Sequence, residues 1–170
     1  TAVFPYPALR QRLVSMAYIF CVTSMVYYGL SLNVGSLSGS IYMNTFISGI
    51  VEFPSHGFAQ VCVDILGRQK TLFLLMGTAA VGVLSSAMFR GSTQVLVSMI
   101  ARFGIAGSFN MIYLYTTELF PTIVRSSCLG TCSLAARVGG IIAPGIILAQ
   151  AISAAVPPVV LGLVAGSACM

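Results

Sequence analysis

The residues best placed to do chemistry are ionisable side chains inside long uncharged stretches. Arg137 follows Arg125 by twelve residues, so an unbroken helix would carry it about 18 Å inward from Arg125. A guanidinium keeps its proton, and placing one at the centre of a membrane-spanning helix costs at least about 2.5 kcal/mol. We therefore expect Arg137 to face a water-filled cavity, an internal acid or an anionic ligand. It either binds substrate or belongs to a structural ion pair.

A second group of polar residues surrounds Pro54. Glu52 and His56 are four residues apart and share one face of a helix, which Pro54 is expected to kink. Glu52 is expected to be the intramembrane charge partner of Arg102 or Arg137, although Arg102 could instead extend toward the membrane surface. His56 could contact substrate as a proton-linked switch, or a neighbouring helix could satisfy it.

Four aromatic residues could line a binding cavity. Tyr27 and Tyr28 precede Gly29, and Phe109 and Tyr113 are one helical turn apart. An aromatic-lined cavity with one fixed charge suits bulky amphiphilic ions, because it combines apolar burial with charge pairing. Packing or contact with lipid is the alternative for each ring.

The composition indicates which elements must position these residues. The sequence is 58% hydrophobic and 6% charged, with a mean hydropathy of +1.00. Soluble domains carry about 25% charged residues, so a water-soluble globule is excluded. The apolar runs are continuous rather than alternating, which predicts helices and not a barrel. The predicted fold class is an all-α membrane protein, a bundle of six transmembrane helices embedded in a lipid bilayer.

Charges and turn residues predict where the helices lie. The 19 uncharged residues between Lys70 and Arg90 match one helix across about 30 Å of hydrocarbon. Basic residues of the N-terminal tail and the even-numbered connections outnumber those of the odd-numbered connections, which predicts a cytoplasmic N-terminus. The predicted spans lie near 13–33, 41–65, 71–89, 94–117, 127–150 and 155–170, the last one truncated.

Several function classes lack the residues that they need. The five cysteines show no zinc-binding spacing, and one histidine with three acidic residues gives too few groups for conventional hydrolysis. The net charge of +5 comes from eight basic and three acidic residues, too few to bind nucleic acid. We therefore expect no enzyme, no metal, no cofactor and no nucleic-acid partner.

Two stretches carry a specific resemblance. Residues 64–70 read DILGRQK, which resembles the D-x-x-G-R-[RK] loop of the major facilitator superfamily. Residues 118–125 read ELFPTIVR, which resembles the E-L-[FY]-P-T-x-x-R segment of the organic ion (cation, anion and carnitine) transporter branch of the solute carriers. Four further stretches agree with that branch in the same order: YYGLSLN at 27–33, VEFP at 51–54, YLYT at 113–116 and ARVGGIIAP at 136–144.

The resemblance implies an architecture and a mechanism. Residues 1–170 would form the C-terminal half of a twelve-helix transporter, equivalent to the seventh helix through the start of the twelfth, and the N-terminal six-helix half would be its partner. The two halves would move small organic ions by alternating access. Asp64, Arg68, Glu118 and Arg125 would form a cytoplasmic gating network. The location implied is the plasma membrane.

The resemblance also bears on the charge of the substrate. Anion- and carnitine-type members carry arginine at the position of Arg137, whereas cation-preferring members carry an acid there. Anion carriers often have a lysine near the position of His56, which this chain matches only in part. An organic anion or a carboxylate-bearing zwitterion is therefore slightly preferred, with an organic cation as the alternative. A self-contained six-helix channel or scaffolding membrane protein remains as an alternative of another class.

Overall fold

The computed structural model describes residues 7–36, 39–89, 91–148 and 156–167. These residues form six α-helices and one short 3₁₀ helix, and no strand occurs in the described ranges, which confirms the predicted all-α six-helix fold. The elements are α1 (Pro7–Asn33), η1 (Val34–Ser36), α2 (Ile41–Leu66), α3 (Arg68–Ser86), α4 (Ser92–Leu119), α5 (Thr122–Leu148) and α6 (Val156–Ser167).

Each helix overlaps one predicted span, but several ends differ because charged residues lie inside the helices. α5 begins directly after Pro121, whose carbonyl accepts hydrogen bonds from the backbone N–H groups of Val124 and Arg125 at 3.1 and 3.0 Å. α3 begins at Arg68, three residues before the predicted span, because Gly67 separates it from α2. Gly67 has φ +82°, a conformation that favours glycine. The predicted ends at residues 150, 155 and 170 lie outside the described ranges.

Three helices are long and apolar enough to cross a membrane by length and composition. They lie at Leu9–Asn33, Ser92–Leu119 and Thr122–Leu148, and Pro157–Ser167 is a shorter apolar helix. Together with the helical fold, these segments are those of a multi-pass membrane protein.

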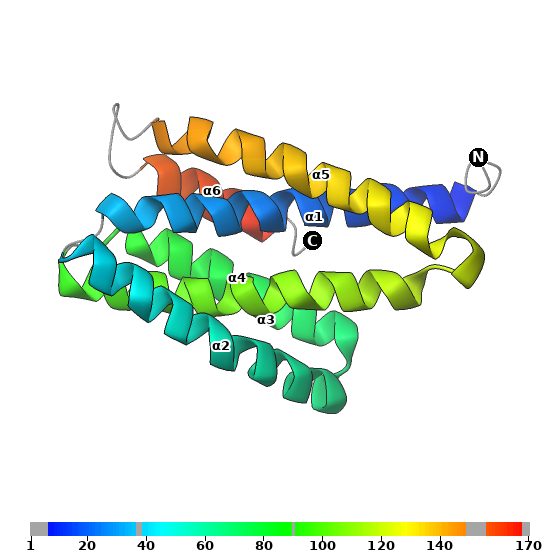
Figure 1. Cartoon of the computed structure of the whole chain (residues 1–170), viewed down its shortest axis with the longest axis horizontal. Coiled ribbons are helices and arrows are strands. Elements are labelled where there is room, and N and C mark those ends of the chain that lie inside the picture. The colour runs from blue at the N-terminus through cyan, green and yellow to red at the C-terminus, as the bar shows by residue number, and fades with distance from the viewer. Residues whose placement is uncertain (1–6, 37–38, 90, 149–155, 168–170) are drawn as a thin grey trace.

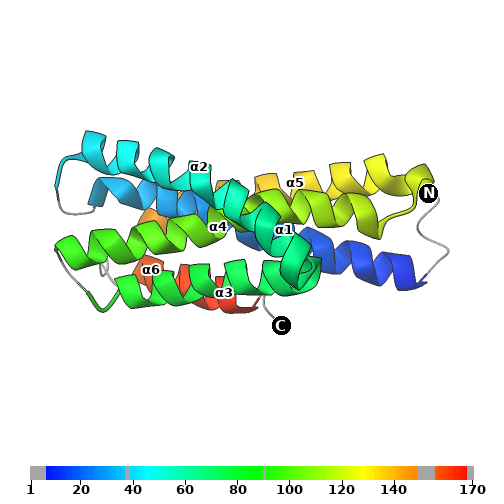
Figure 2. The same cartoon turned by 90° about the horizontal axis from the view of Figure 1, so that it is seen from below.

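The helices run lengthwise side by side (Figure 1), and α1 and α4 pack against each other and between them contact all the other helices. α1 contacts α4, α5 and α6, while α4 contacts α2 and α3 as well as α1. Figure 2 shows α5 and α3 on different sides of the bundle. The largest buried side chains come mainly from α1, α3 and α4, and include Phe20, Leu75, Met76, Ile105, Met111 and Ile112. The core therefore lies where these three helices meet.

Candidate functional site

An ion pair joins α2 to α4 inside the bundle. The Arg102 Nη2 and Nε atoms lie 2.6 and 2.7 Å from Oε1 of Glu52, and Arg102 Nη1 donates a hydrogen bond of 2.7 Å to Ser31 Oγ on α1. The exposed fractions of the two charged side chains are 11% for Arg102 and 23% for Glu52. Of the two partners that the sequence left open for Glu52, the structure places Arg102 beside it. The pair leaves little net charge at this point.

Tyr27 contacts both charges of this pair. Its hydroxyl donates to the two carboxylate oxygens of Glu52 at 3.3 Å each, and the Arg102 guanidinium carbon lies 4.9 Å from the centre of its ring. The ring therefore adds a cation–π contact to the hydrogen bonds. Three helices, α1, α2 and α4, are tied together by the side chains of this cluster.

The four predicted aromatic residues form one row across α1 and α4. Ring centres are 5.6 Å apart for Tyr27 and Tyr28, 5.4 Å for Tyr27 and Phe109, and 5.7 Å for Phe109 and Tyr113. Phe20 extends the row, because its ring centre lies 4.9 Å from that of Tyr113 in an edge-to-face contact. These distances fall in the range of favourable aromatic pairs.

Phe20 and Ser31 are site residues that the sequence analysis missed. Phe20 precedes Tyr27 by seven residues and Ser31 follows it by four, so helical spacing alone places all three on one face of α1. That periodicity was the signal that could have found them.

Arg137 and His56 lie apart from this charged cluster. Both side chains are exposed, and neither forms an ion pair or a hydrogen bond with another residue of the described ranges. Arg137 lies on α5, whose opposite side packs on α1 through small buried residues such as Cys132, Ala136 and Gly139. The guanidinium of Arg137 thus carries a charge that no described acid compensates.

Two of the four residues predicted for the gating network are paired. Arg68, at the start of α3, forms an ion pair with Glu118 at the end of α4, and both side chains are partly exposed. Arg125 Nε donates to the Phe120 carbonyl at 3.4 Å, which links the first turn of α5 to the end of α4. Asp64 is exposed and has no ion pair within the described residues.

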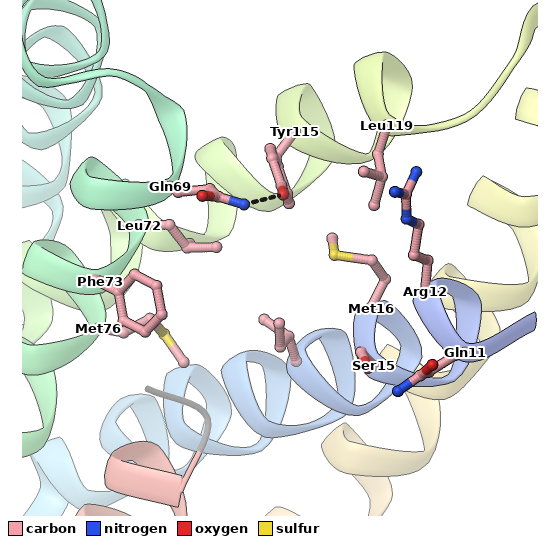
Figure 3. A pocket seen from close by; sticks show the side chains of 11 residues that line it. Gln11, Arg12, Ser15, Met16, Gln69, Leu72, Phe73, Met76, Tyr115 and Leu119 are labelled. Carbon is pink, nitrogen blue, oxygen red and sulfur yellow. Dashed lines mark hydrogen bonds between the residues drawn. The ribbon is translucent and has the colours of Figure 1, made fainter. Parts of the chain in front are cut away.

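A cavity of about 630 Å³ opens near the same end of the bundle, between α1, α3 and α4 (Figure 3). Its polar lining includes Arg12 and Ser15 from α1, and at one edge of the cavity Gln69 donates a hydrogen bond of 2.9 Å to the Tyr115 hydroxyl. Met16 and other apolar side chains complete the wall. None of the predicted substrate-binding residues lines this cavity, and the sequence analysis did not predict it.

The described side chains of this region offer ion pairing and aromatic contact. No group of three histidine, cysteine or acidic residues that could hold a metal occurs in the described ranges. A fixed guanidinium, a neutralised ion pair and a row of aromatic rings are groups that bind an ion and leave its bonds intact.

Comparison with known proteins gives relatives over most of the chain, although no family model matches it. It is 35% identical over 165 residues to solute carrier family 22 member 15-like of Xenopus tropicalis, which covers 93% of this chain and 34% of that protein. It is 36% identical over 151 residues to organic cation/carnitine transporter 4 of Arabidopsis thaliana, covering 84% of this chain and 28% of the relative.

A third relative is another member of solute carrier family 22. Solute carrier family 22 member 6-A of Xenopus laevis is 35% identical over 139 residues, covering 80% of this chain and 25% of that protein. The chain thus spans a quarter to a third of the length of these relatives. The relatives are solute carriers and not enzymes.

Proposed function

Because the chain belongs to the organic ion transporter branch of the solute carriers, we propose that it supplies one six-helix half of a carrier that moves small organic ions by alternating access. The relatives are about three times as long as the chain, which leaves room in them for a second bundle of this size. The proposed partner is an N-terminal six-helix half. The substrate would lie between the two halves, near the middle of the membrane.

The observation that carries the proposal for an anion is the contrast between two arginines. Arg102 is buried against Glu52, so its charge is already compensated. Arg137 is exposed on α5 and has no acidic partner in the described ranges. A carboxylate or another organic anion would compensate it, because a guanidinium binds carboxylates with two parallel hydrogen bonds. We therefore propose an organic anion or a carboxylate-bearing zwitterion as the preferred substrate.

The aromatic row would supply the apolar part of the same site. Tyr28 is 47% exposed, and its ring packs beside Gly140 of α5, the helix that carries Arg137. An organic ion with a ring or a hydrocarbon chain would place its apolar part against Tyr28 and its charge against Arg137. The other rings of the row, Tyr27, Phe109 and Tyr113, would hold Tyr28 in place through their contacts with one another.

His56 would contribute a further polar contact from α2. It is exposed and forms no ion pair within the described residues, so its ring nitrogens are free to bind a polar group of the substrate. We propose that it contacts substrate on the side of the site opposite to α5.

The Arg68–Glu118 pair would act as a latch on the cytoplasmic side. We place the carrier in the plasma membrane with the N-terminus of this chain in the cytoplasm. The Arg68–Glu118 pair lies at the end of the bundle where α1 begins, so it would face the cytoplasm too. Asp64 and Arg125 flank the pair in the sequence motifs. Opening toward the cytoplasm would break the contacts among these residues.

Uptake measurements test the proposed substrate. Labelled dicarboxylate, carnitine and quaternary ammonium compounds are supplied to cells that produce the carrier containing this chain, with and without Arg137→Ala. The expected result is uptake of the dicarboxylate or carnitine, and a loss of at least about tenfold in Arg137→Ala, because one charge-assisted hydrogen bond is worth about 1.5 to 3 kcal/mol. Uptake of the ammonium compound alone, unchanged in Arg137→Ala, would contradict the proposal for an anion.

An organic cation is the second candidate. The row of aromatic rings favours it, because aromatic faces attract cations. In that case the Tyr28→Leu substitution would reduce uptake of the ammonium compound, and Arg137→Ala would leave it unchanged.

A further inference from the structure

Two consecutive glycines form the contact between α1 and α5 beside the proposed site. Gly139 is buried, and a Cβ atom built on it would lie 2.1 Å from the backbone oxygen of Cys21. Carbon and oxygen atoms cannot approach this closely without a bond, so the two helix backbones touch at this point. Glycine at position 139 thus sets the distance between α1 and α5.

Gly140 contacts a side chain instead of a backbone. A Cβ atom on Gly140 would lie 3.2 Å from both Cδ2 and Cε2 of Tyr28 and 3.6 Å from Ser24 Oγ. Carbon atoms in contact prefer about 3.5 to 4.0 Å, so a methyl group would push the Tyr28 ring away from α5 by a few tenths of an ångström. The ring therefore rests on the bare backbone of α5.

The position of this ring matters because of what lies next to it. Gly140 follows Arg137 by three residues, so both lie on one side of α5, one turn apart. Tyr28 is 47% exposed, and Arg137 is exposed as well. A displacement of the ring from α5 would therefore change the space that is open to an ion bound at Arg137.

We propose that Gly140 is a specificity-determining residue: its missing side chain lets the Tyr28 ring rest against α5 and leaves room beside Arg137 for a bulky organic ion. The inference rests on the proposed function and adds a residue to the same site. Gly140 is a positioning residue, because it acts on substrate through Tyr28. A larger residue at position 140 would narrow the site and favour smaller ions.

The test compares the KM for a large, ring-bearing organic ion with the KM for a small organic ion of the same charge, in the carrier that contains this chain. Gly140→Ala is expected to raise the ratio of the two KM values about tenfold, the lower end of what one methylene group is worth in a binding pocket. A general loss of folding would lower both uptake rates and leave the ratio unchanged.

Two further variants test whether Gly140 acts through the Tyr28 ring. Tyr28→Ala removes the ring together with its proposed contact with the substrate and so changes the KM ratio by itself, but adding Gly140→Ala to it is expected to have no further effect because nothing remains to be displaced. Gly145→Ala is the matched control, since a Cβ at Gly145 meets no atom within 4 Å. It should keep the wild-type ratio.

The outcomes separate this inference from the proposed function. A carrier that moves no organic ion in its wild-type form overturns both. A working carrier in which Gly140→Ala keeps the wild-type ratio overturns the role of Gly140 alone. The same holds if Gly145→Ala changes the ratio as much as Gly140→Ala, or if Gly140→Ala acts fully in the absence of the ring.

Discussion

The guanidinium of Arg102 directs two of its nitrogens at one oxygen of Glu52, at 2.6 and 2.7 Å, while its third nitrogen bonds Ser31 at 2.7 Å. One side chain of α4 therefore holds α2 and α1 at the same time. Removing one member of such a buried pair leaves the other charge without compensation, which is more damaging than removing both.

The first prediction concerns this pair. Glu52→Gln should lower the free energy of unfolding by about 3 kcal/mol, because Arg102 stays buried and charged. The double variant Glu52→Gln with Arg102→Met should recover most of the loss. Unfolding can be followed with a maleimide dye that reports on thiols, since Cys62, Cys128 and Cys132 are buried in the folded protein.

Glu118→Gln provides the control for that prediction. Its partner Arg68 is 44% exposed, and exposed ion pairs contribute about 0 to 1 kcal/mol, so its unfolding midpoint should move much less. If Glu118→Gln destabilised the protein as much as Glu52→Gln, burial would not be the reason for the effect.

The second prediction separates the ring of Tyr27 from its hydroxyl. Tyr27→Phe removes two long hydrogen bonds of 3.3 Å but keeps the ring over Arg102, so it should cost at most about 1 kcal/mol of stability. Tyr27→Leu also removes the cation–π contact and the contacts with Tyr28 and Phe109, and it should cost clearly more. Equal unfolding midpoints for the two variants would show that the ring contributes nothing.

The third prediction concerns the proposed latch. Arg68→Ala should speed opening toward the cytoplasm, or impair transport, because the ion pair with Glu118 is lost. Labelling of cysteines introduced beside Arg137, at the proposed substrate site, from the cytoplasmic side would measure the opening. Arg10→Ala, which removes another exposed arginine, is the control and should leave transport and labelling unchanged. Unchanged transport and labelling in Arg68→Ala at equal surface expression would refute the latch.

The fourth prediction compares the effect of adding a side chain at two glycines, one before α3 and one inside it. Gly67 has φ +82° and open space around its missing Cβ, so Gly67→Ala should destabilise through backbone strain alone, by about 1 to 2 kcal/mol. Gly77 lies inside α3 with equally open space, so Gly77→Ala should stabilise by about 0.5 to 1 kcal/mol. Opposite shifts of the two unfolding midpoints are the expected result.

The fold could be predicted from the sequence because long apolar runs leave the backbone no alternative to helices. The ends of the helices were harder to predict, because charged residues such as Arg68 and Arg125 continue a helix beyond its apolar part. Charge spacing also cannot tell which helices touch. For this reason the choice between Arg102 and Arg137 as the partner of Glu52 needed the structure.

The candidate site was predictable to a similar extent. Adjacency in the sequence grouped Tyr27 with Tyr28, and helical spacing grouped Phe109 with Tyr113, but neither showed that the two groups join into one row. The roles of Arg137 and His56 in binding substrate stay predictions. The contact between Gly140 and Tyr28 depends on the distance between two helices, which the sequence of neither helix contains.

The way α5 is held has a mechanical consequence. α5 contacts α1 along much of its length, and its contacts with α4 and α6 are few. A tilt of α1 would therefore move α5, and Arg137 with it, in the same direction. Ser31 lies on the same helix and accepts a hydrogen bond from Arg102, so a tilt of α1 would also disturb the ion pair that joins α4 to α2.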